Sequence, residues 1–340
     1  MKYKTLNAAI IGLGVGERHI QAYKSESRCK LVKLCDIDKG KLKEVGKKHN
    51  DCMLTNDADN IFNDPSIDIV SIASYDNFHA EHVIKAIKSG KHVFVEKPIC
   101  LSEEELISIS KALNENPSLK LSSNFVLRKS PQFIDVKDSI IKNEFGQLYY
   151  LEGDYNYGRV NKVTEGWRGD ISNYSVMHGG GIHLIDLISW LINEPALEVN
   201  ATGNKIVTAG TKFLNFDMIT AFIRFKNDIV VKITSNFGSV TPHHHRLSVY
   251  GTKSTFFHNN NGGIYYYKRE DENYKKEINK TFHNSSKISV LKSFISHIFD
   301  GTNPDVTSKE VLDAMAISIA IEKSLETKSW EKIKFVNTKL

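Results

Sequence analysis

A glycine-rich turn between two apolar segments constrains the fold of this chain more than any other feature. Residues 6–11 are apolar and β-prone, the sequence GLGVGERH follows at once, and a helical pattern covers residues 17–25. A second apolar segment, residues 30–35, ends at the acid Asp36. A strand, a glycine turn, a helix and a strand that ends in a carboxylate form the arrangement that binds dinucleotides. The alternative is a turn of the flavodoxin type that binds no ligand.

The residues of this turn predict particular contacts. Gly12 allows the tight turn, and Gly14 lets the backbone approach a pyrophosphate whose charge lies at the helix N-terminus. Val15 and Gly16 complete the predicted cofactor-binding turn. The usual spacing places the third glycine at residue 17, where this chain has Glu17, so the loop is one residue short. Either Gly16 takes over the packing of the helix on the strand, or the pyrophosphate contact differs.

Asp36 predicts which dinucleotide binds. It stands about 20 residues beyond the glycine turn, where a carboxylate accepts hydrogen bonds from the ribose hydroxyls. Its negative charge would repel a 2′-phosphate, so the sequence favours NAD. The nearby Lys39 leaves NADP open.

Strands and helices continue to alternate up to residue 123. Further apolar strands are predicted at 53–54, 67–73, 92–95 and 119–123, and helices at 41–49, 80–89 and 102–114, the last capped by Ser102. This alternation predicts an α/β fold with a doubly wound parallel sheet. We therefore expect a dinucleotide-binding Rossmann domain over residues 1–123 and a second domain over residues 124–340.

The end of one of these strands predicts a reactive group. Residues 92–95 form a compact apolar strand, and Glu96, Lys97 and Pro98 follow it. Ligands of open parallel sheets bind beyond the carboxyl ends of the strands, and proline cannot continue a central strand. We expect Lys97 to point into an active site. The alternative is a surface ion pair at the strand end.

The pattern after residue 123 predicts a different architecture. A helix is expected at 131–143, strands at 145–159, 221–225, 229–237, 246–250, 264–268 and 330–336, a polar hairpin loop at 259–263, and late helices at 288–299 and 308–326. Strands in a run with few helices between them predict an α+β domain. We expect a largely antiparallel sheet with helices on one face and an open second face.

A second glycine-rich segment lies in this half of the chain. Gly179, Gly180 and Gly181 precede an amphipathic helix with His183 in its first turn. Asp186 lies on the same helical face, because residues three apart are neighbours. Spacing alone leaves two interpretations open, a functional histidine and a packed one.

Three successive histidines, residues 243–245, follow Pro242. Three adjacent residues cannot all face one ion, so we expect no metal site here. We expect His245 to line a substrate pocket instead.

The composition limits the classes of function. The 340 residues have 41% hydrophobic and 25% charged content, as in a soluble globular protein, and no apolar run reaches the roughly 18–20 residues that span a bilayer. The net charge of +5 comes without a Lys/Arg tract, so no nucleic-acid partner is expected. We interpret the N-terminal apolar run as a strand and not as a signal peptide. The four cysteines have no CxxC spacing, which favours neither zinc nor disulfides and indicates a reducing cytoplasm.

The segment IASYDNFHAEHVIKAIKSGKHVFVEKP resembles the signature of the glucose–fructose oxidoreductase/inositol dehydrogenase (Gfo/Idh/MocA) family. Ser74, Asp76 and His79 match the family's turn before the EKP strand end, although Tyr75 replaces the usual proline. The next strand of the family often reads N-x-x-x-R, and SNFVLR matches it. The resemblance extends over essentially the whole chain.

The resemblance implies roles for individual residues. Gly181, His183 and Asp186 match G-x-H-x-x-D, whose histidine is usually the general acid/base, so Lys97 and His183 are the implied catalytic residues. The implied cofactor contacts outside the glycine turn and Asp36 are Ser74, Asp76, His79, Glu96, Lys97 and Asn124. The implied substrate contacts are Arg128, Trp167, Arg168, His178, Asp186 and His245, and for Arg168 a solvated strand-edge arginine is the alternative.

One departure from the family concerns the catalytic histidine. The family often has an aspartate four residues before it, and this chain has Gly179 there. An orienting carboxylate is therefore missing or comes from elsewhere, and the adjacent His178 is a candidate to take part.

The resemblance implies an NAD(P)-dependent oxidoreductase that moves a hydride between nicotinamide and a secondary alcohol of a sugar, polyol or nucleotide-sugar derivative. A homodimer or homotetramer formed through the C-terminal sheet is implied as well, with no membrane partner. A dinucleotide-binding regulatory protein without turnover is the alternative that Gly179 favours. A third interpretation is redox-neutral chemistry on one sugar.

Overall fold

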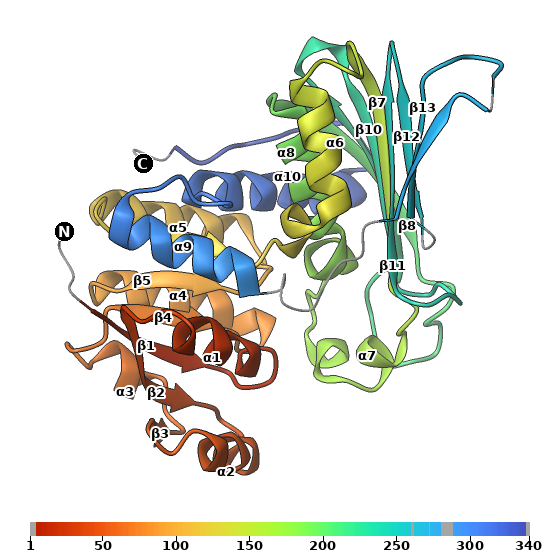
Figure 1. Cartoon of the computed structure of the whole chain (residues 1–340). Helices are drawn as coiled ribbons and strands as arrows, with labels where there is room; N and C mark the ends of the chain where they lie inside the picture. The colour runs from red at the N-terminus through yellow and green to blue at the C-terminus, as the bar shows by residue number, and fades with distance from the viewer. Residues whose placement is uncertain (1–4, 260–261, 272, 280–287, 338–340) are drawn as a thin grey trace. The chain divides into compact units, whose positions relative to one another are not determined.

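The computed structural model describes residues 5–259, 262–271, 273–279 and 288–337 (Figure 1). Contacts group the chain into two units. The first comprises Met1–Val126, Asn284–Asp313 and Val336–Leu340, and the second Leu127–His283 and Ala314–Phe335. One domain was expected over residues 124–340, whereas contacts group Asn284–Asp313 with the first unit. The physical reason is a late helix, α9 (Ser289–Asp300), which lies against α1 (Glu17–Lys24) and a strand of the first unit.

The first unit is built on a parallel sheet, as predicted. Its strands are β1 (Leu6–Ile11), β2 (Cys29–Cys35), β3 (Met53–Thr55), β4 (Ile69–Ile72), β5 (His92–Val95) and β6 (Leu121–Ser123). Their order is β3-β2-β1-β4-β5-β6, and every pair is parallel. The order reverses between β1 and β4, and ligands bind at the carboxyl ends of strands beside such a reversal.

Helices connect these strands. They are α1, α2 (Lys39–Lys48), α3 (Asp59–Phe62), α4 (His79–Lys88) and α5 (Glu103–Glu115). Ser102 caps α5 as predicted, because its hydroxyl accepts a hydrogen bond from the backbone N–H of Glu105. The Asp38 carboxylate caps α2 in the same way. Right-handed crossovers place α1 and α4 on opposite faces of the sheet.

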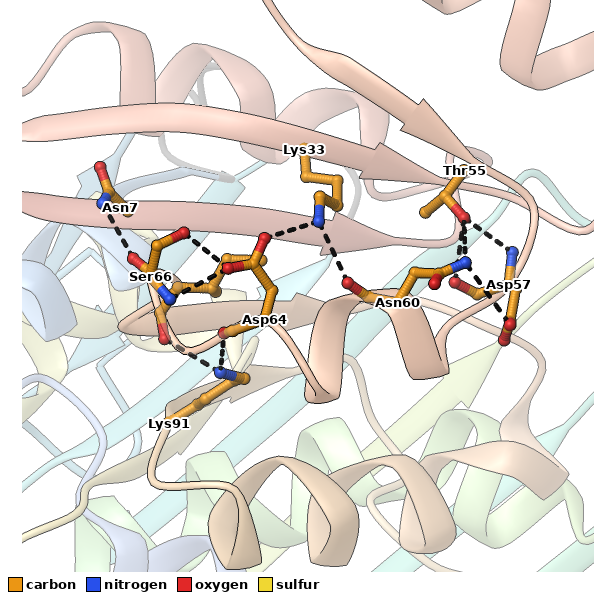
Figure 2. A network of polar contacts seen from close by, with 9 residues as sticks. Asn7, Lys33, Thr55, Asp57, Asn60, Asp64, Ser66 and Lys91 are labelled. Atoms are coloured by element: carbon orange, nitrogen blue, oxygen red, sulfur yellow. Dashed lines mark hydrogen bonds and ion pairs between the residues drawn. The ribbon is translucent and has the colours of Figure 1, made fainter.

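A polar network joins β2 and the start of β5 to the loop that precedes β4 (Figure 2). The Lys91 ammonium, just before β5, donates to the carbonyls of Asp64 and Ile67 at 2.7 and 3.1 Å. The Asp64 carboxylate also accepts from Lys33 of β2 at 2.6 Å. Lys91 is 1% exposed, and burial lowers its pKa although acidic neighbours oppose this. This buried lysine therefore has a structural role.

The second unit contains a nine-stranded sheet. Its strands are β7 (Leu148–Asn156), β8 (Ala196–Asn204), β9 (Met218–Phe225), β10 (Val230–Asn236), β11 (His244–Gly251), β12 (Thr255–Asn259), β13 (Gly262–Tyr266), β14 (Lys275–Ile278) and β15 (Glu331–Lys332). Their order is β14-β13-β12-β11-β7-β10-β9-β8-β15. The β7–β10 pair is parallel and the other described pairs are antiparallel. The largely antiparallel α+β prediction is therefore confirmed.

Several details differ from the sequence-based expectation. β8, β12 and β14 were not predicted, and the strand expected at 330–336 shortens to Glu331–Lys332. Of the loop expected at 259–263, Asn259 pairs with Gly262 at the ends of β12 and β13, and residues 260–261 lie outside the described part. The helices are α6 (Pro131–Ile141), α7 (Asn161–Thr164), α8 (Ile182–Ile192) and α10 (Ser308–Thr327). Among the described helices, none has both the length and the apolar character that crossing a bilayer requires.

Buried and partly exposed residues alternate along β7, and this alternation positions the candidate site of the second unit. Leu151, Gly153 and Tyr155 are buried, while the residues between them are partly exposed. A Cβ on Gly153 would lie 3.2 Å from a methyl group of Leu184, so this face of the sheet packs closely on α8.

Candidate active site

The glycine turn after β1 is shaped by steric demands. Gly12 has φ +87°, and a Cβ there would overlap the backbone carbonyl of Ala73, which follows β4. A Cβ on Gly16 would overlap the Gly12 carbonyl oxygen. Gly16 therefore provides the close packing of helix on strand, and the shortened loop keeps this function. Gly14 is exposed, with no atom within 4 Å of its Cβ position, so the turn is open at the predicted pyrophosphate contact.

Asp36 is fixed against this turn. Its Oδ2 accepts from the backbone N–H of Leu13 at 2.6 Å, and its Oδ1 accepts from that of Asp38 at 2.8 Å. The carboxylate at the end of β2 thus stands beside the turn with lone pairs left for ribose hydroxyls. This donor and acceptor set fits NAD.

The turn after β4 is held by a buried histidine. His79 is 1% exposed, and its Nδ1 and Nε2 lie 2.6 and 3.0 Å from the carbonyl oxygens of Pro98 and Ser74. His79 therefore links the strand end at Pro98 to the Ser74 turn. Asp76 in that turn is also buried. Cofactor contacts of Ser74, Asp76 and His79 stay predictions.

Glu96 lies in a polar cluster at the end of β5. Its Oε1 accepts from Asn124 Nδ2 at 2.7 Å and lies 3.1 Å from His19 Nε2. Its side chain is 13% exposed. Burial alone would raise the pKa of Glu96, but His19, the Asn124 hydrogen bond and the charge of Lys97 together lower it. Lys97 is half-buried, and its peptide bond to Pro98 is cis.

The three glycines before His183 are part of one continuous helical segment. Met177–Gly181 form a π-helical turn that runs directly into α8. A side chain on any of the three would meet a neighbour: Tyr174 at Gly179, Tyr155 at Gly180 and the Met177 sulfur at Gly181. At Gly179 the overlap is with the hydroxyl of Tyr174, a residue only 2% exposed. A phenol oxygen therefore occupies the position of the missing aspartate side chain.

His183 is half-buried in an aromatic cluster of the second unit. Its ring lies 6.2 Å from that of Tyr155, nearly parallel, and 6.1 Å from that of His245, nearly perpendicular. His243 is 4.9 Å from His245 and 5.0 Å from Tyr155. His244 contacts Asn156 instead. His245 therefore lies beside His183, and His243 packs against His245 and Tyr155. The described residues contain no group of side chains able to hold a metal ion.

Arg128 and Asp186, both predicted to bind substrate, bind each other. The Arg128 Nη2 lies 2.6 Å from Asp186 Oδ1, and its Nε donates to both carboxylate oxygens. Their side chains are 4% and 1% exposed. This buried ion pair fixes the start of α8 to the segment after β6, and a substrate contact of either residue stays a prediction.

His178 contacts α10. Its Nδ1 lies 2.7 Å from the Ser318 hydroxyl, and burial lowers its pKa to about 4, so the ring is neutral at pH 7. One turn further along α10, the Glu322 carboxyl accepts a hydrogen bond from Ser175. Burial raises the pKa of Glu322 to about 7 against the effect of that hydrogen bond. A substrate contact of His178 stays a prediction.

Trp167 and Arg168 form a compact pair in the short 3₁₀ turn Trp167–Asp170. The guanidinium carbon of Arg168 lies 4.2 Å from the centre of the Trp167 ring. Both side chains are half-buried. The stacking holds the guanidinium plane, as a recognition arginine requires.

Comparison with known proteins identifies the family. Residues 6–125 match the model of an oxidoreductase family with an NAD-binding Rossmann fold, Gfo/Idh/MocA, and residues 137–334 match the model of its C-terminal α/β domain. The chain belongs to this family of NAD-binding oxidoreductases. The resemblance found in the sequence is therefore confirmed.

Individual relatives cover nearly all or most of the chain. A myo-inositol 2-dehydrogenase of Thermotoga maritima is 24% identical over 97% of this chain and 99% of its own length. A scyllo-inositol 2-dehydrogenase (NAD⁺) of Bacillus subtilis is 26% identical over 74% of this chain and 72% of its own length. A structure of levoglucosan dehydrogenase with NADH and L-sorbose superposes with a TM-score of 0.87 at 19% identity, covering 97% of this chain and 99% of that one.

Three residues of this Gfo/Idh/MocA site were not predicted from the sequence. His19 reaches Glu96 across 77 residues of sequence, Tyr155 stacks on His183, and Tyr174 fills the space at Gly179. The available signal was strongest for Tyr155, because buried and partly exposed residues alternate along β7 and Tyr155 stands at one of the buried positions. His19 and Tyr174 carry no local signal that separates them from core residues.

Proposed function

We propose that the chain is an NAD-dependent dehydrogenase that oxidises a secondary alcohol of a sugar, polyol or nucleotide-sugar derivative. One observation carries the proposal. The strand order β1-β4-β5 brings the open glycine turn, the Ser74 turn and the Glu96–Lys97 strand end to neighbouring carboxyl ends of one sheet. An ammonium group next to the predicted nicotinamide subsite suits charge that develops on an alcohol oxygen. The named inositol and levoglucosan dehydrogenases among the relatives support the substrate class.

The two proposed catalytic residues have distinct roles. NAD⁺, when bound, supplies the hydride acceptor. Lys97 hydrogen-bonds the alcohol oxygen and stabilises its developing negative charge. His183 accepts the hydroxyl proton at one ring nitrogen. Both groups act at one oxygen, and their convergence on it is part of the proposal.

The second unit supplies the proposed substrate contacts. His245 and Tyr155 lie against His183, and they combine apolar faces with polar edges, as a polyhydroxy ring requires. The Arg168 guanidinium, stacked on Trp167, suits a ring oxygen or an anionic substituent.

The test is NADH formation with a panel of inositols, sugars, anhydrosugars and nucleotide sugars. We expect NADH to accumulate with at least one secondary alcohol, and NADP⁺ to be a poorer acceptor because of Asp36. Tight dinucleotide binding without turnover on any compound would contradict the proposal and favour a regulatory protein. Product without net NADH would indicate redox-neutral chemistry.

We also infer that the open face of the nine-stranded sheet pairs copies of this chain into a homodimer or homotetramer. On the face opposite α8, cross-strand partners form a row that contains Phe257, Ser248, Glu152, Lys232 and Phe222. The two phenylalanines are 37% and 44% exposed, and Lys232 lies 3.1 Å from Glu152. Phe222→Lys should shift the molecular mass in solution toward the monomer, and Val240→Lys, at a fully exposed residue outside this row, should leave it unchanged. An unchanged mass in Phe222→Lys would contradict the inference.

A reducing compartment such as the cytoplasm fits the four cysteines, all of which are free thiols. Burial raises the pKa of Cys35 to about 12, so this thiol is unreactive. Unchanged electrophoretic mobility with and without reductant would support this inference, and a disulfide-linked species in protein purified from its own cells would contradict it.

A further inference from the structure

We propose that His19 and Asn124 are positioning residues of the catalytic site, which hold the Glu96 carboxylate in place next to Lys97. The inference rests on the proposed function, because it assigns these residues to the support of Lys97. None of the sequence motifs singled out His19, and the contact joins α1 to the end of β5.

The geometry is that of two donors on one carboxylate oxygen. Asn124, just after β6, donates its amide N–H to Glu96 Oε1 at 2.7 Å. His19, from the first turns of α1, brings Nε2 to the same oxygen at 3.1 Å. The backbone N–H of Glu96 also donates to the Ile72 carbonyl at 2.8 Å, in register with β4. Main chain and side chain of Glu96 are therefore fixed from three elements of one unit.

The surroundings make these contacts specific. His19 is 1% and Asn124 8% exposed, and the His19 ring meets Phe94 edge-on at 5.4 Å. His19 Nδ1 is buried and has no hydrogen-bond partner among the described residues, so Glu96 is the polar contact of this ring. Burying a polar ring without partners costs free energy. The contact with Glu96 therefore stabilises His19 in its buried position.

The electrostatic consequence reaches Lys97. Burial favours the neutral form of Glu96, and His19, Asn124 and Lys97 favour the carboxylate. Two titratable groups lower the pKa of Glu96: His19 of α1, and Lys97, which follows Glu96 in the chain. If His19 no longer donates, the pKa of Glu96 rises and Lys97 loses part of a fixed negative charge beside it.

Two substitutions at residue 19 separate positioning from packing. His19→Leu removes the hydrogen-bond donor and fills the space of the ring with an apolar side chain. His19→Gln can instead place an amide N–H near the position of Nε2. His49→Leu, at a half-buried histidine outside the site, is the matched control. We expect His19→Leu to lower kcat about tenfold or more, the size of one charge-assisted hydrogen bond. The acidic limb of the kcat/KM profile should move to higher pH, because the Glu96 carboxylate is then protonated more readily.

His19→Gln should recover most of both changes, and NADH affinity should stay within about twofold of the parent in both His19 variants. Asn124→Leu should act in the same direction as His19→Leu. A His19→Leu enzyme with an unchanged pH profile, or an equal loss in His19→Gln, would overturn the proposal.

A readout that needs no substrate keeps this test separate from the proposed function. Because the Glu96 pKa is lowered in the folded state, its contribution to stability is present at neutral pH and is lost as the pH falls. The loss in melting temperature of His19→Leu should therefore be larger at pH 7 than at pH 4, and the His19→Gln loss should not. If this difference appears while no alcohol is oxidised, the proposed function fails and the His19–Glu96 contact stands. If Lys97→Met abolishes turnover and His19→Leu changes neither readout, the inference alone fails.

Discussion

The hydroxyl of Tyr174 occupies the space into which a side chain at Gly179 would extend. This position lies four residues before His183, where a helix presents residues of one face to each other. In this chain a neutral phenol from a preceding turn therefore replaces a carboxylate carried on the helix itself. The Tyr174 ring is held by Phe213 at 6.1 Å and Phe237 at 6.4 Å, so the hydroxyl is firmly positioned.

Gly179→Ala tests this relationship. The new methyl group would lie 2.7 Å from Cζ of Tyr174 and overlap its hydroxyl, so we expect a loss of about 1–3 kcal/mol in urea unfolding, as for overpacked cores. Tyr174→Leu should provide room for the methyl group. The two substitutions should then couple, and Gly179→Ala should cost much less when it is combined with Tyr174→Leu. Additive costs would show that the two residues do not compete for one space.

Two glycines of the first turn should respond in opposite ways to alanine. Gly12→Ala places a Cβ 2.7 Å from Ser74 N in a left-handed backbone, so we expect a loss of about 3 kcal/mol or more in unfolding free energy. Gly14→Ala meets open space and should unfold like the parent. It should instead weaken NADH binding about tenfold, measured by NADH fluorescence, because the backbone can no longer approach the pyrophosphate. Unchanged NADH affinity in Gly14→Ala would contradict the cofactor assignment.

Glu322 should make stability depend on pH. Burial raises its folded pKa from 4.5 to about 7, so the folded state holds a proton that the unfolded state releases. The contribution of Glu322 to the free energy of unfolding is fully present below the pKa of the unfolded state. It is lost as the pH rises through the pKa of the folded state, by about 3 kcal/mol in total. Glu322→Gln should remove this decline in urea unfolding between pH 5 and 8. Glu165→Gln, at an exposed acid, should retain it.

The ion pair of Arg128 and Asp186 predicts an asymmetric response. Asp186→Leu leaves a buried guanidinium without its carboxylate and should cost about 3–5 kcal/mol in urea unfolding. Arg128→Met combined with Asp186→Leu removes both charges and should recover most of that loss, because apolar replacements of buried pairs are often neutral. A double variant as unstable as Asp186→Leu would show that the pair acts through other contacts.

The sequence predicted the parts of the fold that follow local periodicity. The β1–glycine turn–α1–β2–Asp36 unit came from apolar periodicity and glycine spacing, and both are local properties. β8 was missed because polar and turn-forming residues such as Glu198, Asn200 and Gly203 interrupt it. β12 and β14 have only 5 and 4 residues, too few for a clear period. Their partner strands, and not their own propensity, hold them in the sheet.

The site was predictable where residues stand at strand ends or helix starts. Lys97 and His183 could be singled out in that way, and their catalytic roles stay predictions. The partners of these residues could not be predicted, since His19 and Glu96 are 77 residues apart and meet only through the strand order. The hydroxyl at Gly179 depends on how Tyr174 folds back on a π-helical turn, which no residue spacing predicts.

The most direct test of the account is turnover by Lys97→Met, His183→Asn and the double variant with NAD⁺ and an alcohol that the parent oxidises. We predict that each single variant loses about 10²–10³-fold in kcat and still binds NADH, and that the double variant loses little more, because the two groups act on one oxygen. Lys88→Met, on the exposed end of α4, should turn over like the parent. Parental kcat in Lys97→Met would contradict the account.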